Sequence, residues 1–189
     1  MSHKFLLHAS TQLLLVQIDQ ELFESTRAAG CPFCNGPLHR ANYPRSPCGL
    51  PESLREYYRR RYSFTCGRCR KRTSSPTVRF FGRRWFPAPL LLLISALNVG
   101  ANEGRIAQLN RLFGVVISES TWKRWRIWWR DCFPTTSYWM ISLAQFLHTL
   151  PIERFPRGLF LSYSGGLQPR LISVLNFLAP ITAGAFRAV

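Results

Sequence analysis

The sequence predicts an α+β fold in which a small cysteine-bearing ribbon of strands is followed by a mostly helical region. Two Cys-x-x-Cys motifs bound a segment rich in turn residues, and residues 63–86 mix Thr, Val, Phe, Arg and Gly as short strands do. Apolar residues recur at helical spacing before and after this segment. The predicted parts are an N-terminal amphipathic helix over 1–30, the ribbon with a long insert over 31–86, a helix-turn-helix over 87–134, and a helical segment over 135–189.

The first helix is expected over residues 9–29 and should end at Gly30. It carries an apolar residue at every fourth position: Leu14, Ile18 and Leu22. Residues 31–50 are rich in Pro, Gly and Asn, which favours loop. Residues 51–62 are expected to form a short helix that has a proline in its first turn.

Two short cysteine motifs predict a metal centre. They supply four thiol groups: Cys31, Cys34, Cys66 and Cys69. Four thiolates suit the tetrahedral coordination of Zn²⁺, and a complete set of protein ligands leaves no position for a catalytic water. We therefore expect one structural Zn²⁺ per chain, with Cys48 or His39 left open as a substitute ligand. Cys132, flanked by two aromatic residues, is expected to be a buried apolar group.

The chain is strongly basic, with 25 Lys and Arg residues against 9 Asp and Glu residues and a net charge of +16. Residues 31–85 hold 13 of the basic residues and only 2 of the acidic ones. Such an excess predicts a polyanionic partner, most simply nucleic acid. The candidate contacts around the second cysteine motif are Arg59, Arg60, Arg61, Arg68, Arg70, Lys71, Arg72, Arg79, Arg83 and Arg84.

A helix-turn-helix is expected after the ribbon. The predicted helices cover 89–100, 103–113 and 118–132. Gly114 supplies the turn before the third helix, although this turn is about two residues longer than is typical of the motif. The third helix, capped by Ser118 or Ser120, places Trp122, Trp125 and Trp129 on one face, which we expect to pack in the core. The candidate DNA contacts of this helix are Ser120, Thr121, Lys123, Arg126 and Arg130.

Four motifs between Cys31 and Phe133 carry a resemblance to a known class of protein. They are CPFCNGPLHRANYPR, CGRCRKRTSSPTVRFFGRRWF, RIAQLNRLFGV and TWKRWRIWWRDCFP. This run resembles small bacterial zinc-ribbon/helix-turn-helix proteins associated with transposable elements, and the ribbon is similar to the DNA-binding heads of some transposases. The resemblance implies DNA binding and a zinc-ligand role for the four cysteines of the two motifs. It implies no particular reaction.

We expect the protein to bind double-stranded DNA as an accessory or regulatory factor of a mobile element. We expect no catalytic activity, because the chain has few acids, no closely spaced histidine pair and no glycine-rich phosphate loop. One alternative is an RNA-binding zinc ribbon. Another is an adaptor that docks a catalytic partner such as a transposase, or that self-associates, through 135–189. A cytoplasmic, DNA-associated location without a membrane is expected, because the longest apolar stretch, about 85–97, is too short to span a bilayer.

Overall fold

The computed structural model describes residues 4–45, 52–81, 88, 89, 92, 107, 111, 118–146, 150 and 154–183. These residues form helices and small antiparallel sheets, as the α+β prediction requires. Apart from isolated residues, the predicted helices over 89–100 and 103–113 lie outside the described part of the chain. The arrangement of a helix-turn-helix is therefore not among the structural findings.

The predicted N-terminal helix is confirmed as α1, Ala9–Ala29, preceded by a short 3-10 helix, Lys4–Leu7. Gly30 ends α1 with a φ of +77°, a left-handed value that glycine adopts without strain. The buried face consists of Thr11, Gln12, Leu15, Asp19 and Phe23. It is displaced by one position from the predicted apolar stripe, whose residues are half-buried.

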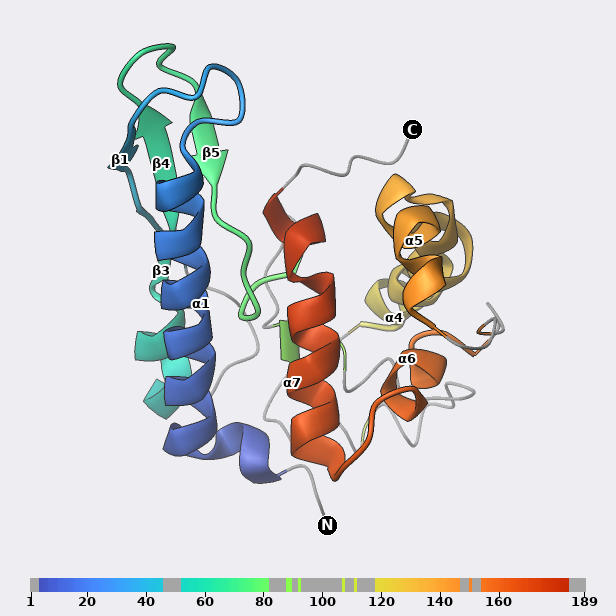
Figure 1. Cartoon of the computed structure of the whole chain (residues 1–189). Coiled ribbons are helices and arrows are strands. Elements are labelled where there is room, and N and C mark those ends of the chain that lie inside the picture. The colour runs from blue at the N-terminus through green and yellow to red at the C-terminus, as the bar shows by residue number, and fades with distance from the viewer. Residues whose placement is uncertain are drawn as a thin grey trace.

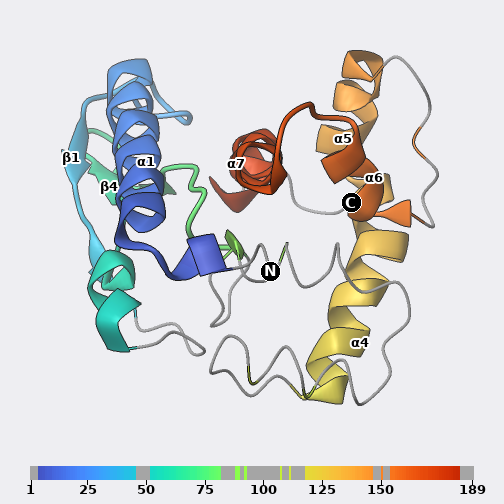
Figure 2. The same cartoon turned by 90° about the horizontal axis from the view of Figure 1, so that it is seen from below.

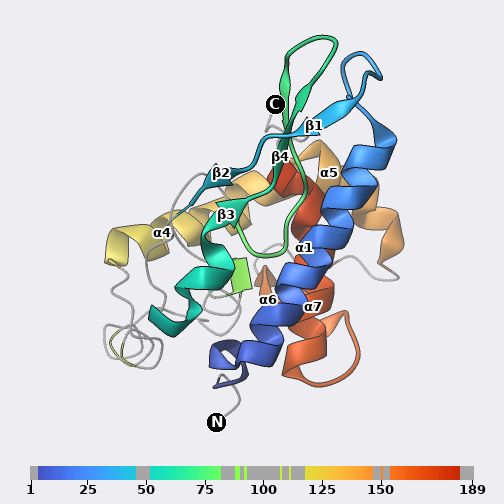
Figure 3. The ribbon, with the colours of Figure 1, turned by 90° about the vertical axis from the view of Figure 1, so that its left-hand side faces the viewer.

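The two sheets lie on one side of α1 (Figures 1 and 3). The larger sheet has the order β1-β4-β5, and all of its strands are antiparallel: β1 is Leu38–Arg40, β4 is Ser63–Cys66 and β5 is Arg72–Ser74. The smaller sheet pairs β2, Tyr43–Pro44, with β3, Arg60–Arg61. The helix expected over 51–62 is a 3-10 helix, Glu52–Tyr58, which ends where the chain enters β3. Phe23 of α1 stacks on Phe64 of β4 with ring centroids 4.3 Å apart, so α1 covers the larger sheet.

The helix predicted over 118–132 is present, but its last turn is wider than expected. It comprises α4, Glu119–Ile127, and a π-helical turn, Trp128–Cys132. The hydroxyl oxygen of Ser118 accepts a hydrogen bond from the backbone N–H of Thr121 at 3.3 Å, which confirms the predicted N-cap. After a short 3-10 helix, Phe133–Thr135, the helical segment predicted over 135–189 begins with α5, Ser137–Ser142, and a 3-10 turn, Leu143–Gln145.

The C-terminal part contains α6, Arg157–Leu161, then α7, Leu167–Leu178, and a 3-10 helix, Ala179–Ala183. Figure 2 shows α7 between α1 on one side and α5 with α6 on the other. The residues of α7 that fill the main core are Leu171, Val174, Leu175 and Leu178. The apolar stretch at 167–180, which also suited docking or self-association, is thus largely used inside the chain.

The same core receives aromatic side chains from the α4–α5 region. Trp129 and Phe133 are buried within it, with ring centroids 5.2 Å apart. Trp125 is half-buried against this core, and the side chain of Trp122 is not described. The predicted core face of α4 is therefore confirmed at Trp129 and in part at Trp125. No helix in the described ranges is long and apolar enough to cross a membrane.

Candidate metal centre and basic surface

The two Cys-x-x-Cys motifs fold into matching turns. In the first, the backbone N–H of Asn35 donates to the carbonyl oxygen of Cys31 at 2.8 Å, and in the second Arg70 donates to Cys66 at 3.1 Å. Asn35 and Arg70 each follow the second cysteine of their motif, and both have left-handed φ values, 54° and 61°. The two turns have the same backbone conformation, so each turn presents its two thiol groups together on one side. The first turn directly follows α1, and the second connects β4 to β5.

The four thiol groups meet in one cluster. The Sγ atoms of Cys31, Cys34, Cys66 and Cys69 all lie within 4.8 Å of one another. The Sγ atoms of Cys31 and Cys69 are 3.6 Å apart, and those of Cys34 and Cys66 are 3.5 Å apart. Four sulfurs at about 2.3 Å from a tetrahedral Zn²⁺ would be separated by roughly 3.8 Å. None of these cysteines forms a disulfide. The cluster therefore has the dimensions of a structural metal site.

The immediate surroundings of Cys66 favour its thiolate form. The backbone N–H groups of Cys69 and Arg68 donate to its Sγ at 3.4 and 3.3 Å. These hydrogen bonds, the one from Cys69 above all, lower the pKa of Cys66 to about 6. A thiolate is the form that binds a metal ion. The local backbone thus favours the thiolate at Cys66. At Cys69 the backbone N–H of Lys71 lowers the pKa, but burial and hydrogen bonds with the other thiols of the cluster together raise it to about 11.

Gly36 lies directly beside the cluster, where there is no room for a side chain. A Cβ atom added to Gly36 would lie 3.1 Å from Sγ of Cys66, 3.3 Å from Sγ of Cys34 and 2.9 Å from Cβ of Arg68. Contacts of this length do not occur at ordinary Cβ atoms without a shift of the neighbours. Glycine is therefore required here by the close approach of the second cysteine turn to the first.

Of the other cysteines and the histidine considered in the sequence, those that the structure describes do not lie in the four-cysteine cluster. His39 is exposed on β1 and does not belong to the cluster of metal-ligating atoms found among the described residues. Cys48 lies outside the described residues. Cys132 is half-buried in the π-helical turn, away from the four-cysteine cluster, so its expected burial is only partial.

Basic side chains surround the second cysteine turn. Four of them are exposed: Arg68, Arg70, Lys71 and Arg72. The ion pairs within the described part of the chain join other residues, so no carboxylate within that part neutralises these four. Lys71 lies over the ring of Phe33 at 4.6 Å, and Arg72 donates to the carbonyl oxygen of Ala41 at 2.8 Å. These contacts orient both side chains, while their charge stays open to solvent.

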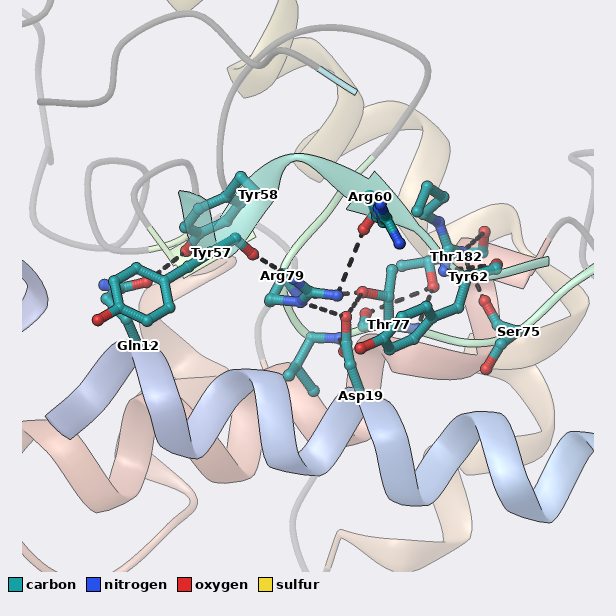
Figure 4. A network of polar contacts seen from close by, with 12 residues as sticks. Gln12, Asp19, Tyr57, Tyr58, Arg60, Tyr62, Ser75, Thr77, Arg79 and Thr182 are labelled. Atoms are coloured by element: carbon teal, nitrogen blue, oxygen red, sulfur yellow. Dashed lines mark hydrogen bonds and ion pairs between the residues drawn. The ribbon is translucent and has the colours of Figure 1, made fainter. Parts of the chain in front are cut away.

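Two arginines predicted to contact nucleic acid are buried instead. Arg61 and Arg79 each have 3% of their surface exposed. Arg61 donates to the carbonyl oxygen of Ser75 at 2.5 Å. Arg79 donates to the carboxylate of Asp19 at 2.7 Å, as Figure 4 shows. A guanidinium enclosed in this way cannot reach a phosphate without breaking the fold. We correct the prediction accordingly and assign both side chains to the interior.

The network around Arg79 joins separate parts of the chain. Arg79 also donates to the backbone carbonyl of Tyr57, and the carboxylate of Asp19 accepts from the backbone N–H of Val78 at 2.6 Å and from the hydroxyl of Thr77. Thr182, after α7, accepts from the backbone N–H of Thr77 at 2.8 Å. Figure 4 shows these groups converging above α1. The 3-10 helix Glu52–Tyr58, α1, the segment after β5 and Thr182 are therefore held together by a shared polar cluster.

The basic stripe predicted on the third helix is exposed. Lys123, Arg126 and Arg130 of the α4 region all face solvent, and Ser120 near its start is exposed as well. Thr121 is partly covered, since its hydroxyl lies 3.0 Å from that of Ser118 and it accepts from Arg124.

One cation of this stripe has a carboxylate partner. Arg130 forms a two-point ion pair with the adjacent Asp131, at 2.6 and 2.7 Å. Its charge is thus partly compensated, unlike that of Lys123 or Arg126. Arg83 and Arg84, the last two predicted contacts around the second cysteine motif, lie outside the described residues.

Sequence reasoning missed two exposed arginines that belong to the same basic surfaces. Arg124 lies on α4 beside the predicted stripe, and Arg40 lies at the end of β1. Arg124 could have been found by including every cation of the helix instead of one stripe. Arg40 lies over the ring of Phe23 at 4.9 Å, a contact that connects residues 17 positions apart in sequence and has no local signal.

Comparisons of the chain with protein-family models, with curated proteins and with solved structures find no match. The cysteine cluster and the distribution of charge over the described residues are therefore the features that bear on function.

Proposed function

We propose that this protein binds double-stranded DNA through a basic surface that is organised by a structural Zn²⁺. The observation that carries the proposal is the position of four exposed cations, Arg68, Arg70, Lys71 and Arg72, on and beside the cysteine turn, without a carboxylate partner in the described part of the chain. Exposed arginine and lysine side chains held at fixed positions are suited to phosphate contacts.

Zinc is the ion that the ligand set favours. Thiolates are soft ligands, and a tetrahedral set of four sulfurs is typical of structural Zn²⁺ or of iron–sulfur sites. The cluster here is small, with its two shortest sulfur separations near those of a mononuclear site. When bound, the ion supplies folding free energy and fixes the two cysteine turns relative to each other. It has no catalytic role, because the four thiolates complete its coordination.

We further propose that α4 reads base edges while the cysteine turn grips the backbone. Support comes from the exposure of Lys123 and Arg126 on a helix that is anchored in the core through Trp129 of the adjoining π-helical turn. This is the arrangement of a helix that enters a major groove. The proposed interface comprises Arg59, Arg60, Arg68, Arg70, Lys71, Arg72, Ser120, Thr121, Lys123, Arg126 and Arg130.

The protein would act by binding, as an accessory or regulatory factor of a mobile element, and this part of the proposal rests on the resemblance of its motifs. Competition between duplex DNA and an RNA hairpin of equal charge tests the class of nucleic acid, with zinc-loaded protein and a labelled duplex. Duplex DNA should displace the label at lower concentration than the hairpin. Preferential displacement by the hairpin would replace the DNA proposal by the RNA alternative.

A further inference from the structure

An open cavity of about 670 Å³ lies between α1 and residues 56–62, of which Arg60 belongs to the smaller sheet. Its volume is within the range of small-molecule sites, about 300 to 1,000 Å³. One wall is formed by α1 and includes the apolar residues Leu13 and Val16. The opposite wall contains the cations Arg40, Arg59 and Arg60. The cavity is therefore apolar on one side and positively charged on the other.

The charge of the basic wall is available to a ligand. Arg59 and Arg60 are exposed, and neither side chain takes part in an ion pair with a carboxylate of the described residues. Arg40 lies 4.0 Å from Glu24, a loose contact at the surface. Glu56 is the acid that lines the cavity. The fourth arginine of the lining, Arg79, is paired with Asp19, so three arginines against one glutamate leave an excess that attracts an anion.

Aromatic side chains also line the cavity, and their positions are supported by neighbouring residues. Tyr57 and Tyr62 are half-buried and both line the cavity. Tyr62 contacts Phe23 at a centroid distance of 5.2 Å, and the guanidinium of Arg79 lies 5.2 Å from the Tyr62 ring. Arg79 also donates to the backbone carbonyl of Tyr57 (Figure 4). The buried network thus fixes the backbone that presents the Tyr57 ring, and a fixed ring is suited to stacking.

We propose that this cavity binds one nucleotide unit, with the base against Tyr57 and the apolar α1 wall and the phosphate at Arg59 and Arg60. Aromatic stacking together with arginine–phosphate contacts is the chemistry by which single nucleotides are bound. A base inside an intact duplex is stacked and paired, so the ligand is an unpaired nucleotide of a strand or a free mononucleotide. The strand form of this inference rests on the proposed DNA-binding function, whereas the free form does not.

The test compares a fully paired duplex with the same duplex carrying one extruded adenosine. Zinc-loaded protein should bind the second about 5- to 150-fold more tightly, as expected for one stacked base. Tyr57→Leu should remove this preference and leave affinity for the paired duplex unchanged, whereas Tyr57→Phe, which keeps the ring, should retain it. Leu13→Asp provides an independent variant at an exposed position of the opposite wall, and it should also remove the preference.

Competition with free ligands distinguishes an unpaired nucleotide of a strand from a free mononucleotide as the ligand of the cavity. Adenosine 5′-monophosphate should compete with the extruded adenosine for the cavity, and inorganic phosphate at the same concentration should not. If the monophosphate binds in a Tyr57-dependent manner but no duplex binds, the cavity assignment holds as a free-nucleotide site and the proposed function fails. If duplexes bind but Tyr57→Leu and Leu13→Asp keep the full preference, or if phosphate competes as well as the monophosphate, the nucleotide assignment is overturned and the proposed function stands.

Discussion

Asp19 Oδ2 accepts a hydrogen bond from Nε of Arg79 at 2.7 Å, although the two residues are 60 positions apart and both are almost completely buried. This ion pair connects α1 to the chain that follows the larger sheet. Its remaining hydrogen bonds, to backbone groups on both sides, satisfy the polar atoms that burial would otherwise leave unpaired. The pair therefore belongs to the folded framework beneath the basic surface.

Removing one partner of this pair should destabilise the whole chain. Arg79→Ala leaves the carboxylate of Asp19 buried without its cation, which typically costs about 3–5 kcal/mol. The measurement is the free energy of unfolding in urea. Arg27→Ala is the matched control, because Arg27 is exposed and lies 3.9 Å from Glu24, and it should change stability by less than about 0.5 kcal/mol. Equal stability of the two variants would show that Arg79 is not buried as described.

Tyr58 should make the fold sensitive to alkaline pH. Burial raises the pKa of its hydroxyl above the usual value, and the hydroxyl donates to Gln12 at 2.8 Å. Above about pH 10 the unfolded chain loses this proton while the folded chain keeps it, so the free energy of unfolding falls as pH rises. Tyr58→Phe should lower stability at neutral pH by about 1–3 kcal/mol, because Gln12 loses its donor. It should also weaken the alkaline decline. An unchanged decline in urea titrations between about pH 8 and about pH 11 would contradict this account.

The clustering of the four cysteines could be predicted from sequence because the information is local. A Cys-x-x-Cys motif forms a tight turn with both thiol groups on one side, and two such motifs are sufficient to form a tetrahedral site. The first helix was equally predictable, since its apolar spacing and Gly30 lie within one continuous segment. Ser118 is confirmed as the cap of α4 for the same reason.

The burial of Arg61 and Arg79 could not be predicted in this way, because their partners are distant in sequence. Arg60 and Arg61 are adjacent on β3, and strand alternation places one outward and one inward, but sequence does not say which. One signal was present in α1. An acidic residue, Asp19, interrupts its apolar side, and a buried carboxylate requires a buried cation.

The glycine beside the cysteine cluster offers a specific test of the metal centre. Gly36→Ala places a methyl group against Sγ of Cys66 and Sγ of Cys34, so it should distort the site and lower zinc affinity by at least about tenfold. Gly166→Ala is the control, because an added Cβ there meets no atom within 4 Å. The measurement is zinc retention in competition with a chelator. The two variants should differ clearly, and equal retention would argue against metal coordination by this cluster.

Backbone contact and base reading should separate by mutation. Arg70→Ala combined with Lys71→Ala should weaken binding to every duplex by a similar factor, because phosphate contacts carry no direct sequence information. Arg126→Ala should instead reduce the preference for a selected site over random duplex, by about 1–3 kcal/mol if it contacts a guanine. The measurement is the affinity of each variant for the selected site and for the random duplex. A uniform loss with Arg126→Ala would remove α4 from base reading.

The most direct test of the central claim is the salt dependence of duplex binding by the zinc-loaded chain. If the exposed cations neutralise roughly six phosphates, a plot of log affinity against log salt concentration should have a slope of about −5. The combined Arg70→Ala and Lys71→Ala variant should make the slope shallower by up to about two. A slope near zero, or no binding to any duplex at low salt, would contradict the account of a DNA-binding surface built around the cysteine cluster.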